Sequence, residues 1–262
     1  MGRPMAANLS HAGFTVVGYD VDRAALAESG VQAATSPAEV ADRAPVVISI
    51  VRTRDQTEAA LFGEDGLLAS EREGLDIIVM STIDPGSMAD IAVRAGERGA
   101  VAIDAPVSGG VRGAREGTLS IMVSGDEQAV ARAQPLFMAL GSRVFAVGAR
   151  PGMAQAVKLA NQLMLASSLM GTLEGLSLAA AAGVVPEQVL PVIAASTGSS
   201  WAALNWDDVV AMWEGDPLEG PIGIILKDLR SIEREEGEKS LDLPAARLAL
   251  EMLTDAWARA RL

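Results

Sequence analysis

The first residues of the chain, MGRPMAANLSHAGFTVVGYD (residues 1–20), predict the fold of its first half. Residues 5–12 carry apolar side chains at helical spacing, and Gly13 is a residue type that commonly follows a helix C-terminus. Residues 15–19 are a short apolar strand that ends at Asp20. A helix, a glycine turn, a strand and a terminal acid make up the second half of a mononucleotide-binding βαβ unit. We therefore predict an α/β fold with a Rossmann-like, doubly wound parallel sheet.

The segment that normally precedes this helix is missing from the sequence as given. A complete unit begins with a strand and a glycine-rich phosphate loop, whereas this sequence starts at Met1 and Gly2. The first strand is central in a doubly wound sheet, so two other strands are expected to lack a ladder partner. The pyrophosphate site is expected to be incomplete, because backbone N–H groups of that loop hold the phosphates. We expect weak dinucleotide binding by this chain.

Composition narrows the classes of function. The chain has 262 residues, half of them apolar, which suits one large domain or two smaller ones. Its net charge of −13 argues against nucleic acid or an anionic membrane as a partner. The absence of cysteine excludes thiolate catalysis, and a single histidine, His11, argues against a histidine-based metal site. The N-terminus does not read as a secretory signal, which predicts a cytoplasmic protein.

One apolar run, LMLASSLMGTLEGLSLAAAAG (residues 163–183), approaches the length of a membrane-spanning helix. Glu174 lies in its middle, and the run is rich in alanine, serine and glycine rather than leucine and isoleucine. Small side chains allow two helices to approach closely. We therefore expect a buried helix in an α-helical domain or a dimer interface, and not a membrane span.

The character of the chain changes near Pro151. Before it, short apolar runs alternate with helical segments, as a parallel sheet with crossover helices requires. After it, almost every segment reads as helix. We predict a nucleotide-binding domain at residues 1–150 and an all-helical substrate and dimerisation domain at residues 151–262. The strand predictions are residues 15–19, 45–51, 76–80, 101–105, 118–124 and 143–147.

Asp20 is the first candidate binding residue. A carboxylate at the end of the second strand of such a fold binds the adenosine ribose hydroxyls and repels a 2′-phosphate, which favours NAD over NADP. Arg23 keeps NADP open as an alternative. A purely structural role for Asp20, in the turn that precedes the next helix, is the other interpretation.

Polar and glycine residues follow three further predicted strands. Val51 and Arg52 end one strand, and Thr82 follows the next, at the edge where ligands of open α/β sheets bind. The segment DAPVSGG (residues 104–110) places Ser108, Gly109 and Gly110 after an apolar strand. Backbone N–H groups without large side chains suit a carboxylate or a phosphate, although an ordinary glycine turn reads the same way.

A long helix is predicted to begin near Gly152 and to carry Lys158, Asn161 and Gln162 on one face. A lysine held among apolar neighbours has a lowered pKa, which suits it to exchange a proton with an alcohol. A surface lysine on an amphipathic helix is the alternative interpretation.

These segments, in this order, resemble the β-hydroxyacid dehydrogenases, the family of 3-hydroxyisobutyrate dehydrogenase and 2-hydroxy-3-oxopropionate reductase. The resemblance covers nearly the whole chain and rests on MGRPMAANL, STIDP, DAPVSGG, the run from Gly148 to Lys158, and LKDL at residues 226–229. It implies a Rossmann domain joined by a long helix to an all-helical domain, usually in dimers or tetramers. It also implies hydride transfer between NAD or NADP and a small 3-hydroxy acid or its semialdehyde.

The resemblance assigns a role to each candidate residue. Lys158 matches the catalytic lysine, which takes or returns the hydroxyl proton. The positions that match substrate contacts are Ser108, Gly109, Gly110, Asn161 and Gln162. The positions that match cofactor contacts are Gly2, Asp20, Val51, Arg52, Gln56, Thr82 and Lys227, of which Lys227 closes over the site.

The chain departs from the family pattern at three places. Gly2 is the last glycine of the phosphate loop, and the earlier ones are missing. Gln162 stands where the family usually has asparagine, with Asn161 beside it, and the chain stops at Arg261-Leu262, earlier than expected. Two alternatives follow. One is an imine reductase of the same fold, although those generally replace the lysine. The other is a truncated, non-catalytic homologue.

Overall fold

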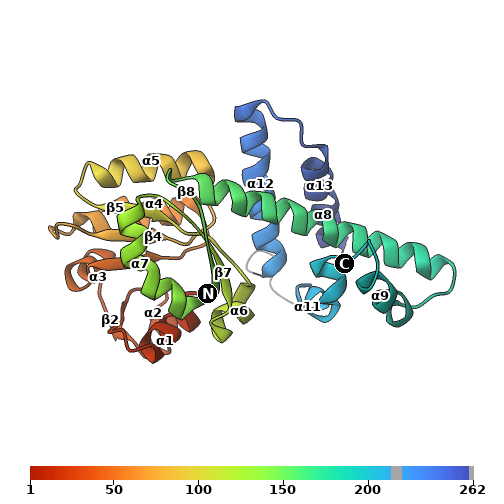
Figure 1. Cartoon of the computed structure of the whole chain (residues 1–262), viewed down its shortest axis with the longest axis horizontal. Coiled ribbons are helices and arrows are strands. Elements are labelled where there is room, and N and C mark those ends of the chain that lie inside the picture. Colours follow the sequence, from red (N-terminus) through yellow and green to blue (C-terminus); the bar gives the residue numbers. More distant parts are fainter. Residues whose placement is uncertain (214–219, 260–262) are drawn as a thin grey trace. The chain divides into compact units, whose positions relative to one another are not determined.

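The computed structural model describes residues 1–213 and 220–259 and divides the chain into two compact units, Met1–Lys158 and Leu159–Leu262 (Figure 1). The division falls inside a helix, a little after the boundary expected from the sequence. The first turns of that helix belong to the first unit because they are hydrogen-bonded to its sheet.

The first unit alternates strands and helices, as its sequence predicts. Its strands are β1 (Val17–Gly18), β2 (Gln32–Ala33), β3 (Val46–Ser49), β4 (Asp76–Val79), β5 (Val101–Asp104), β6 (Val107–Ser108), β7 (Leu119–Ser124) and β8 (Gly141–Gly148). Its helices are α1 (Gly2–His11), α2 (Arg23–Ala27), α3 (Pro37–Arg43), α4 (Arg54–Phe62), the 3-10 turn Leu67–Ala69, α5 (Pro85–Gly96), α6 (Gly110–Glu116) and α7 (Glu127–Leu140).

The main sheet is mixed rather than wholly parallel. Its order is β3-β4-β5-β7-β6, and β8 pairs with β7. The pairs β3–β4, β4–β5 and β7–β8 are parallel, whereas β7 runs antiparallel to both β5 and β6. β6 follows β5 after two residues, and only ten residues (109–118) connect β6 to β7. A connection of fewer than about a dozen residues returns the chain antiparallel. The prediction of a parallel sheet is therefore correct for its first half.

The strands β1 and β2 form a separate parallel pair. Within the described residues, no strand pairs with the free edge of β1 or of β3. In the strand order of a doubly wound fold, these two edges are the neighbours of the first strand. Apolar residues of α1, Met5 and Leu9, are buried in the cluster against which Ile48 of β3 packs.

The two faces of the main sheet carry separate cores. Ile77 belongs to one apolar cluster, together with Met88 and Ile91 of α5. Its neighbour Ile78 belongs to the other, which includes Phe137 of α7. Successive residues of a strand point to opposite faces, so β4 is covered on both sides, as a doubly wound sheet requires.

Three elements differ from the sequence predictions. α1 begins at Gly2 rather than at residue 5. The strand β2 is only two exposed residues long and carries no apolar alternation. The segment after Ser108 was predicted as a turn, but it forms α6 between Gly109 and Gly117, which both have positive φ angles. The glycines that suggested a turn mark the two ends of a short helix.

The second unit is helical. Helix α8 (Met153–Ala181) enters it from the first unit, and α9 (Pro186–Ala194), α10 (Trp201–Leu204), α11 (Trp206–Ala211), α12 (Pro221–Lys239) and α13 (Pro244–Arg259) follow. Residues such as Leu169 of α8, Leu229 of α12 and Leu253 of α13 form one apolar core. The end of the chain at Arg261-Leu262, noted in the sequence, lies outside the described residues.

Candidate functional site

Gly152 begins the segment that carries the candidate catalytic lysine. Its φ angle is +95°, and a Cβ atom at this position would lie 2.5 Å from the carbonyl oxygen of Pro85, at the start of α5. Only glycine combines this backbone conformation with so close an approach. The first turn of α8 is therefore packed directly against the end of the loop that follows β4.

The carboxylate of Asp104, the last residue of β5, binds the first turn of α8. Its Oδ2 accepts hydrogen bonds from the backbone N–H groups of Gly152 (2.9 Å), Ala154 (3.1 Å) and Gln155 (3.2 Å). The Ser124 hydroxyl donates to the same oxygen at 2.9 Å. Asp104 is fully buried, and burial raises its pKa, although the hydrogen bonds from Ser124, Gln155 and Gly152 partly oppose this. Asp104 therefore acts as an N-terminal cap for α8 from a distant strand.

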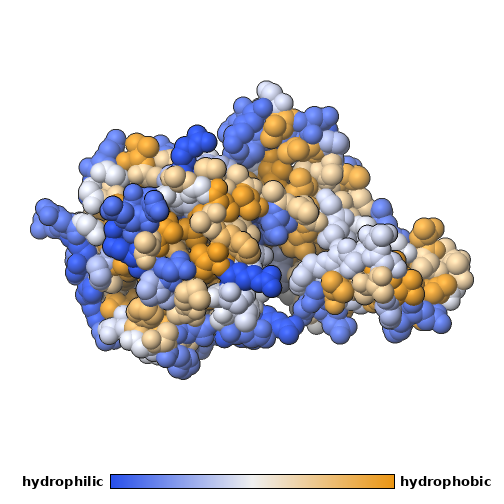
Figure 2. All heavy atoms as spheres, viewed as in Figure 1, coloured by the Kyte–Doolittle hydropathy of each residue, from blue (hydrophilic) through white to orange (hydrophobic). Residues whose placement is uncertain are grey.

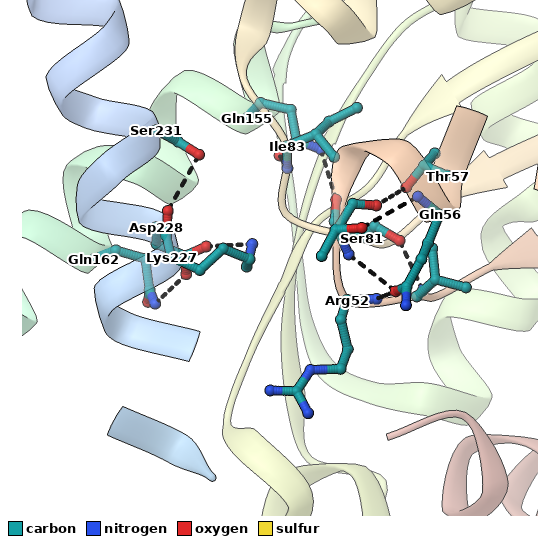
Figure 3. A network of polar contacts seen from close by, with 12 residues as sticks. Arg52, Gln56, Thr57, Ser81, Ile83, Gln155, Gln162, Lys227, Asp228 and Ser231 are labelled. Carbon is teal, nitrogen blue, oxygen red and sulfur yellow. Dashed lines mark hydrogen bonds and ion pairs between the residues drawn. The ribbon is translucent and has the colours of Figure 1, made fainter. Parts of the chain in front are cut away.

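Gln155 joins α8 to two strand ends (Figure 3). Its Nε2 donates to Asp104 Oδ1 (2.9 Å) and to the Ser81 carbonyl oxygen (3.1 Å), and its Oε1 accepts from the Ile83 N–H (3.1 Å). The side chain is fully buried. All three polar groups of the amide are thus used, and the loop after β4 is held against the helix.

Lys158 follows Gln155 by three residues on α8 and is also buried, with 6% of its surface exposed. Gln162, one further turn along, is 5% exposed. Gln155, Lys158 and Gln162 therefore form a polar stripe on a buried face of the helix. The alternative interpretation of Lys158 as a surface lysine is wrong, since such residues keep their ammonium group in water.

The predicted carboxylate cradle lies at the junction of β6 and α6. Ser108 ends β6, Gly109 precedes the helix and Gly110 begins it. Both glycines have positive φ angles, +128° and +61°, and a Cβ atom on Gly110 would meet no atom within 4 Å. The space beside this turn is open, which fits the predicted role in binding a substrate.

Apart from Asp20, the predicted cofactor contacts of the first unit lie near the ends of β3 and β4. A Cβ atom on Gly2 would lie 3.3 Å from Ile50, so the start of α1 lies against the end of β3. The Val51 N–H donates to the Ser81 hydroxyl at 2.8 Å, and Thr82 follows Ser81 directly. These residues surround the edge at which open α/β sheets bind ligands.

Gln56 has a structural role that the sequence analysis did not foresee. The side-chain oxygen of Gln56 accepts from the backbone N–H groups of Arg52 (2.9 Å) and Thr53 (3.2 Å). The backbone N–H of Gln56 donates to the Thr53 hydroxyl. This is a capping box at the start of α4. The assignment of Gln56 to the cofactor stays a prediction, while its carbonyl group serves the helix.

Asp20 is exposed after β1, and its Oδ1 accepts from the Asp22 N–H at 2.9 Å. Asp22 in turn caps α2. The side chain of Arg23 packs over the ring of Tyr19 and donates to the carbonyl oxygens of Ala34 and Thr35. Asp20 thus has the structural role in the turn before α2 that was one of its two interpretations. Its exposed position is also compatible with binding a ribose.

In the second unit, Asp228 of α12 brings two predicted residues together (Figure 3). The Gln162 Nε2 donates to its Oδ2 at 2.7 Å, and the Lys227 Nζ forms an ion pair with its Oδ1 at 2.6 Å. Asn161 lies beside them, with its Nδ2 at 3.4 Å from the Gln162 Oε1. Asp228 is fully buried, so it holds both side chains in fixed orientations.

Comparison with known proteins finds a matching family model for each of the two units. The NAD-binding domain of 6-phosphogluconate dehydrogenase, as a family model, matches residues 1–148, and the NAD-binding domain of NADP-dependent 3-hydroxyisobutyrate dehydrogenase matches residues 152–261. The mitochondrial 3-hydroxyisobutyrate dehydrogenase of Homo sapiens is 38% identical over 238 residues, which are 87% of this chain and 70% of that protein. The chain belongs to the β-hydroxyacid dehydrogenase family. It is an NAD(P)-dependent hydroxyacid oxidoreductase.

Other β-hydroxyacid dehydrogenases are similar over more of their length. The NAD-dependent L-serine dehydrogenase of Pseudomonas aeruginosa is 34% identical over 261 residues, 96% of this chain and 87% of that protein. The crystal structure of 3-hydroxyisobutyrate dehydrogenase from Salmonella typhimurium has a TM-score of 0.85 at 30% identity, and covers 97% of this chain and 90% of that one. An imine reductase of Streptomyces aurantiacus, at 18% identity and a TM-score of 0.69, shares the fold alone.

Three buried polar residues of this site had no predicted role: Asp104, Gln155 and Asp228. Asp104 and Asp228 lie inside motifs that the sequence analysis quoted, DAPVSGG and LKDL. The available signal was a charged residue inside an apolar segment, since such residues are rarely buried without partners. Several of the partners are distant along the chain: the Gly152 N–H lies 48 positions from Asp104, and Gln162 lies 66 positions from Asp228.

Proposed function

We propose that this chain transfers hydride between a small 3-hydroxy acid and NAD, with Lys158 as the proton acceptor in the oxidation of the alcohol. The observation that carries this proposal is a buried lysine, Lys158, on a helix whose first turn is hydrogen-bonded to the ends of β4 and β5. In open α/β sheets, dinucleotides bind outside the carboxyl ends of the strands. A non-catalytic role would not require a lysine to be buried there.

In the proposed oxidation, the residues of the chain move one proton and hold the substrate. A bound nicotinamide supplies the acceptor for the hydride that leaves the carbinol carbon. The neutral amine of Lys158 takes the hydroxyl proton as the carbonyl forms, and later releases it to solvent. Ser108, Gly109 and Gly110 hold the substrate carboxylate, and Asn161 and Gln162 contact the rest of the substrate. In reduction, Lys158 returns the proton to the oxygen.

The preference for NAD over NADP belongs to the same proposal. Asp20 is exposed at the end of β1, where its negative charge opposes a 2′-phosphate. Arg23, the residue that would favour NADP, donates hydrogen bonds to the carbonyl groups of Ala34 and Thr35. Gly2 and the N-terminus of α1 fit a phosphate group, because no side chain caps the first turn of that helix.

Steady-state kinetics test the reaction and the cofactor together. We expect reduction of NAD⁺ with 3-hydroxyisobutyrate or L-serine, the substrates named for the relatives, and a lower kcat/KM with NADP⁺. Lys158→Met should lower kcat by about 10²- to 10⁴-fold and leave the Kd for NADH nearly unchanged. Turnover of the Lys158 variant within a few-fold of the parent would contradict the assignment, and a clear NADP⁺ preference would contradict the role of Asp20.

We also propose a cytoplasmic homodimer or homotetramer. In the described part of the chain, α8 is long and apolar enough to cross a membrane by length and composition, and 22% of its most apolar window is buried. Met164 and Leu178 on this helix are 73% and 78% exposed. Figure 2 shows hydrophobic residues near the α8–α9 end of the second unit. A second copy packed on α8 accounts for this surface, and Glu174, exposed on the same helix, disfavours lipid. Analytical ultracentrifugation of the detergent-free protein measures the assembly.

A further inference from the structure

The contacts at the start of α8 form one connected network. Asp104 binds the first backbone N–H groups of the helix, and Gln155 binds Asp104 and the loop after β4. The Ser81 carbonyl group accepts from Gln155, while the Ser81 hydroxyl accepts from the Val51 N–H. The network therefore connects the ends of β3, β4 and β5 with a single helical turn, and all these residues belong to the first unit.

A buried carboxylate is a costly way to hold a helix. Asp104 is fully buried, and among the described residues its hydrogen-bond partners are hydroxyl, amide and backbone N–H groups rather than a cation. Burial of a charge without an ion pair costs stability unless several hydrogen bonds and a favourable dipole compensate for it. The N-terminus of α8 supplies that dipole. A fully satisfied polar network of this kind fixes one arrangement of the backbone.

Lys158 lies one turn beyond this network. It is three residues after Gln155, on the same buried face of an unbroken helix. A shift or rotation of the first turn of α8 is therefore transmitted to the Lys158 amine. The residues at the other end of the network, Val51 and the segment at Thr82, are the proposed cofactor contacts.

We propose that Asp104 and Gln155 are positioning residues that set the place of the Lys158 amine relative to the strand ends that hold the nicotinamide cofactor. This inference rests on the proposed role of Lys158 in proton transfer. Neither residue takes part in the transfer itself. Gln155 fixes the distance between the helix and the loop after β4, and Asp104 fixes the end of the helix.

The test replaces Gln155 by methionine, which keeps a similar volume and removes its three hydrogen bonds. Gln128→Met, at an exposed position of α7, is the matched control. The chain has three lysines, Lys158, Lys227 and Lys239, so acetylation by acetic anhydride and mass spectrometry reports each one separately. Lys239, whose side chain is 53% exposed, serves as the internal reference. We expect Lys158 in Gln155→Met to react several-fold faster relative to Lys239, and no change in Gln128→Met.

Kinetics supply the second readout. We expect kcat of Gln155→Met to fall by about 10- to 100-fold, since a displacement of about 1 Å has effects of this size, with the Kd for NADH little changed. The primary deuterium isotope effect on kcat should rise, because a misplaced acceptor slows the chemical step. If the parent protein has no activity, the proposed function is contradicted. The positioning role of Gln155 can still be tested in that case, because the labelling of Lys158 does not require turnover.

Two results would overturn the inference. One is a Gln155→Met protein that is folded, with Lys158 reactivity and kcat equal to those of the parent. The other is a fall in kcat that matches only the loss of folded protein measured by circular dichroism. If Gln155→Met does not fold, Ser124→Ala provides the same test. The Ser124 hydroxyl donates to Asp104 and accepts from the Ala154 N–H, so its removal should give smaller changes in the same direction, and their absence would contradict the proposal.

Discussion

The charge of Asp104 gives the protein a pH dependence of known sign. Burial raises the pKa of this carboxyl group above its ordinary value of 3.8, against the opposing hydrogen bonds from Ser124, Gln155 and Gly152. The folded state therefore binds the proton more tightly than the unfolded state. The stabilising contribution is complete below the unfolded pKa and is lost as the pH rises through the folded pKa.

Asp104→Asn removes this titration. We expect the free energy of unfolding of the parent, relative to the variant, to decrease as the pH rises from about 4 through the pKa of the folded carboxyl group. Denaturant unfolding of both proteins across this range measures the difference. The difference in the free energy of unfolding at any one pH also includes the hydrogen bonds lost in the variant. Only the change of this difference with pH therefore reports the titration of Asp104. A difference that does not change with pH would show that the carboxyl group titrates alike in both states.

The sequence indicated Lys158 as a candidate because the helical spacing and the motif around it are local, and its catalytic role stays a prediction. It gave no role to Asp104 or Gln155, although both stand in quoted segments. The hydrogen bonds that join them to each other, to α8 and to the loop after β4 span 48 to 74 positions of the chain, and no local pattern specifies which distant N–H group a carboxylate will meet. Gln56 differs from these two residues, because its side-chain oxygen takes part in a local capping box, whereas the resemblance assigned Gln56 to the cofactor.

Among the strands, β3 and β4 have similar apolar sequences but different surroundings. β4 lies between β3 and β5, whereas β3 is paired on one side only. The N–H groups on the free edge of β3 have no ladder partner among the described residues. The pair β1–β2 is only two residues long on each strand, and isolated two-stranded ribbons are marginally stable.

We therefore expect graded protection in amide hydrogen exchange. Residues 76–79 and 101–104 should exchange most slowly, alternate amides of residues 46–49 faster, and residues 17–33 fastest, because local opening is cheapest where fewest ladder bonds must break. Exchange followed by NMR resolves these amides, and β4 is the internal control. Equal protection of β3 and β4 would mean that another segment pairs with the outer edge of β3.

The strands that were predicted well share one property: each has a run of apolar residues long enough to be recognised in the sequence. β4, β5 and β7 are mostly apolar and buried. β2 was missed because two exposed residues have no periodicity. α6 was missed because its glycines also suit a turn, and only the packing of Gly113 and Ala114 in the core separates the two.

For the molecule as a whole, composition and motif order predicted the fold class and the family, which the comparisons confirm. The mixed direction of the sheet was not predicted, because the direction of β7 depends on the short connection through β6. The unpaired edges of β1 and β3 agree with the position at which a first strand would lie. The effect of these edges on cofactor affinity stays a prediction.

That effect can be measured with a chimera. We expect this chain to bind NADH weakly, and a version preceded by an added strand and glycine-rich phosphate loop to bind at least 10-fold more tightly, roughly 1.4 kcal/mol. Added N–H groups would then surround the pyrophosphate. Isothermal titration calorimetry of both proteins gives the two Kd values. Equal affinities would mean that the first strand and its loop are dispensable.

The anchoring of α8 by Asp104 and Gln155 also constrains how this protein folds. Its hydrogen bonds close loops of 48 to 74 residues, and such contacts form only after much of the chain entropy has been lost. Until then the carboxylate and the amide stay hydrated. Docking of the helix must therefore come late in folding, and loss of the network should mainly accelerate unfolding rather than slow refolding. The buried polar contacts would in this way slow the unfolding of the native state.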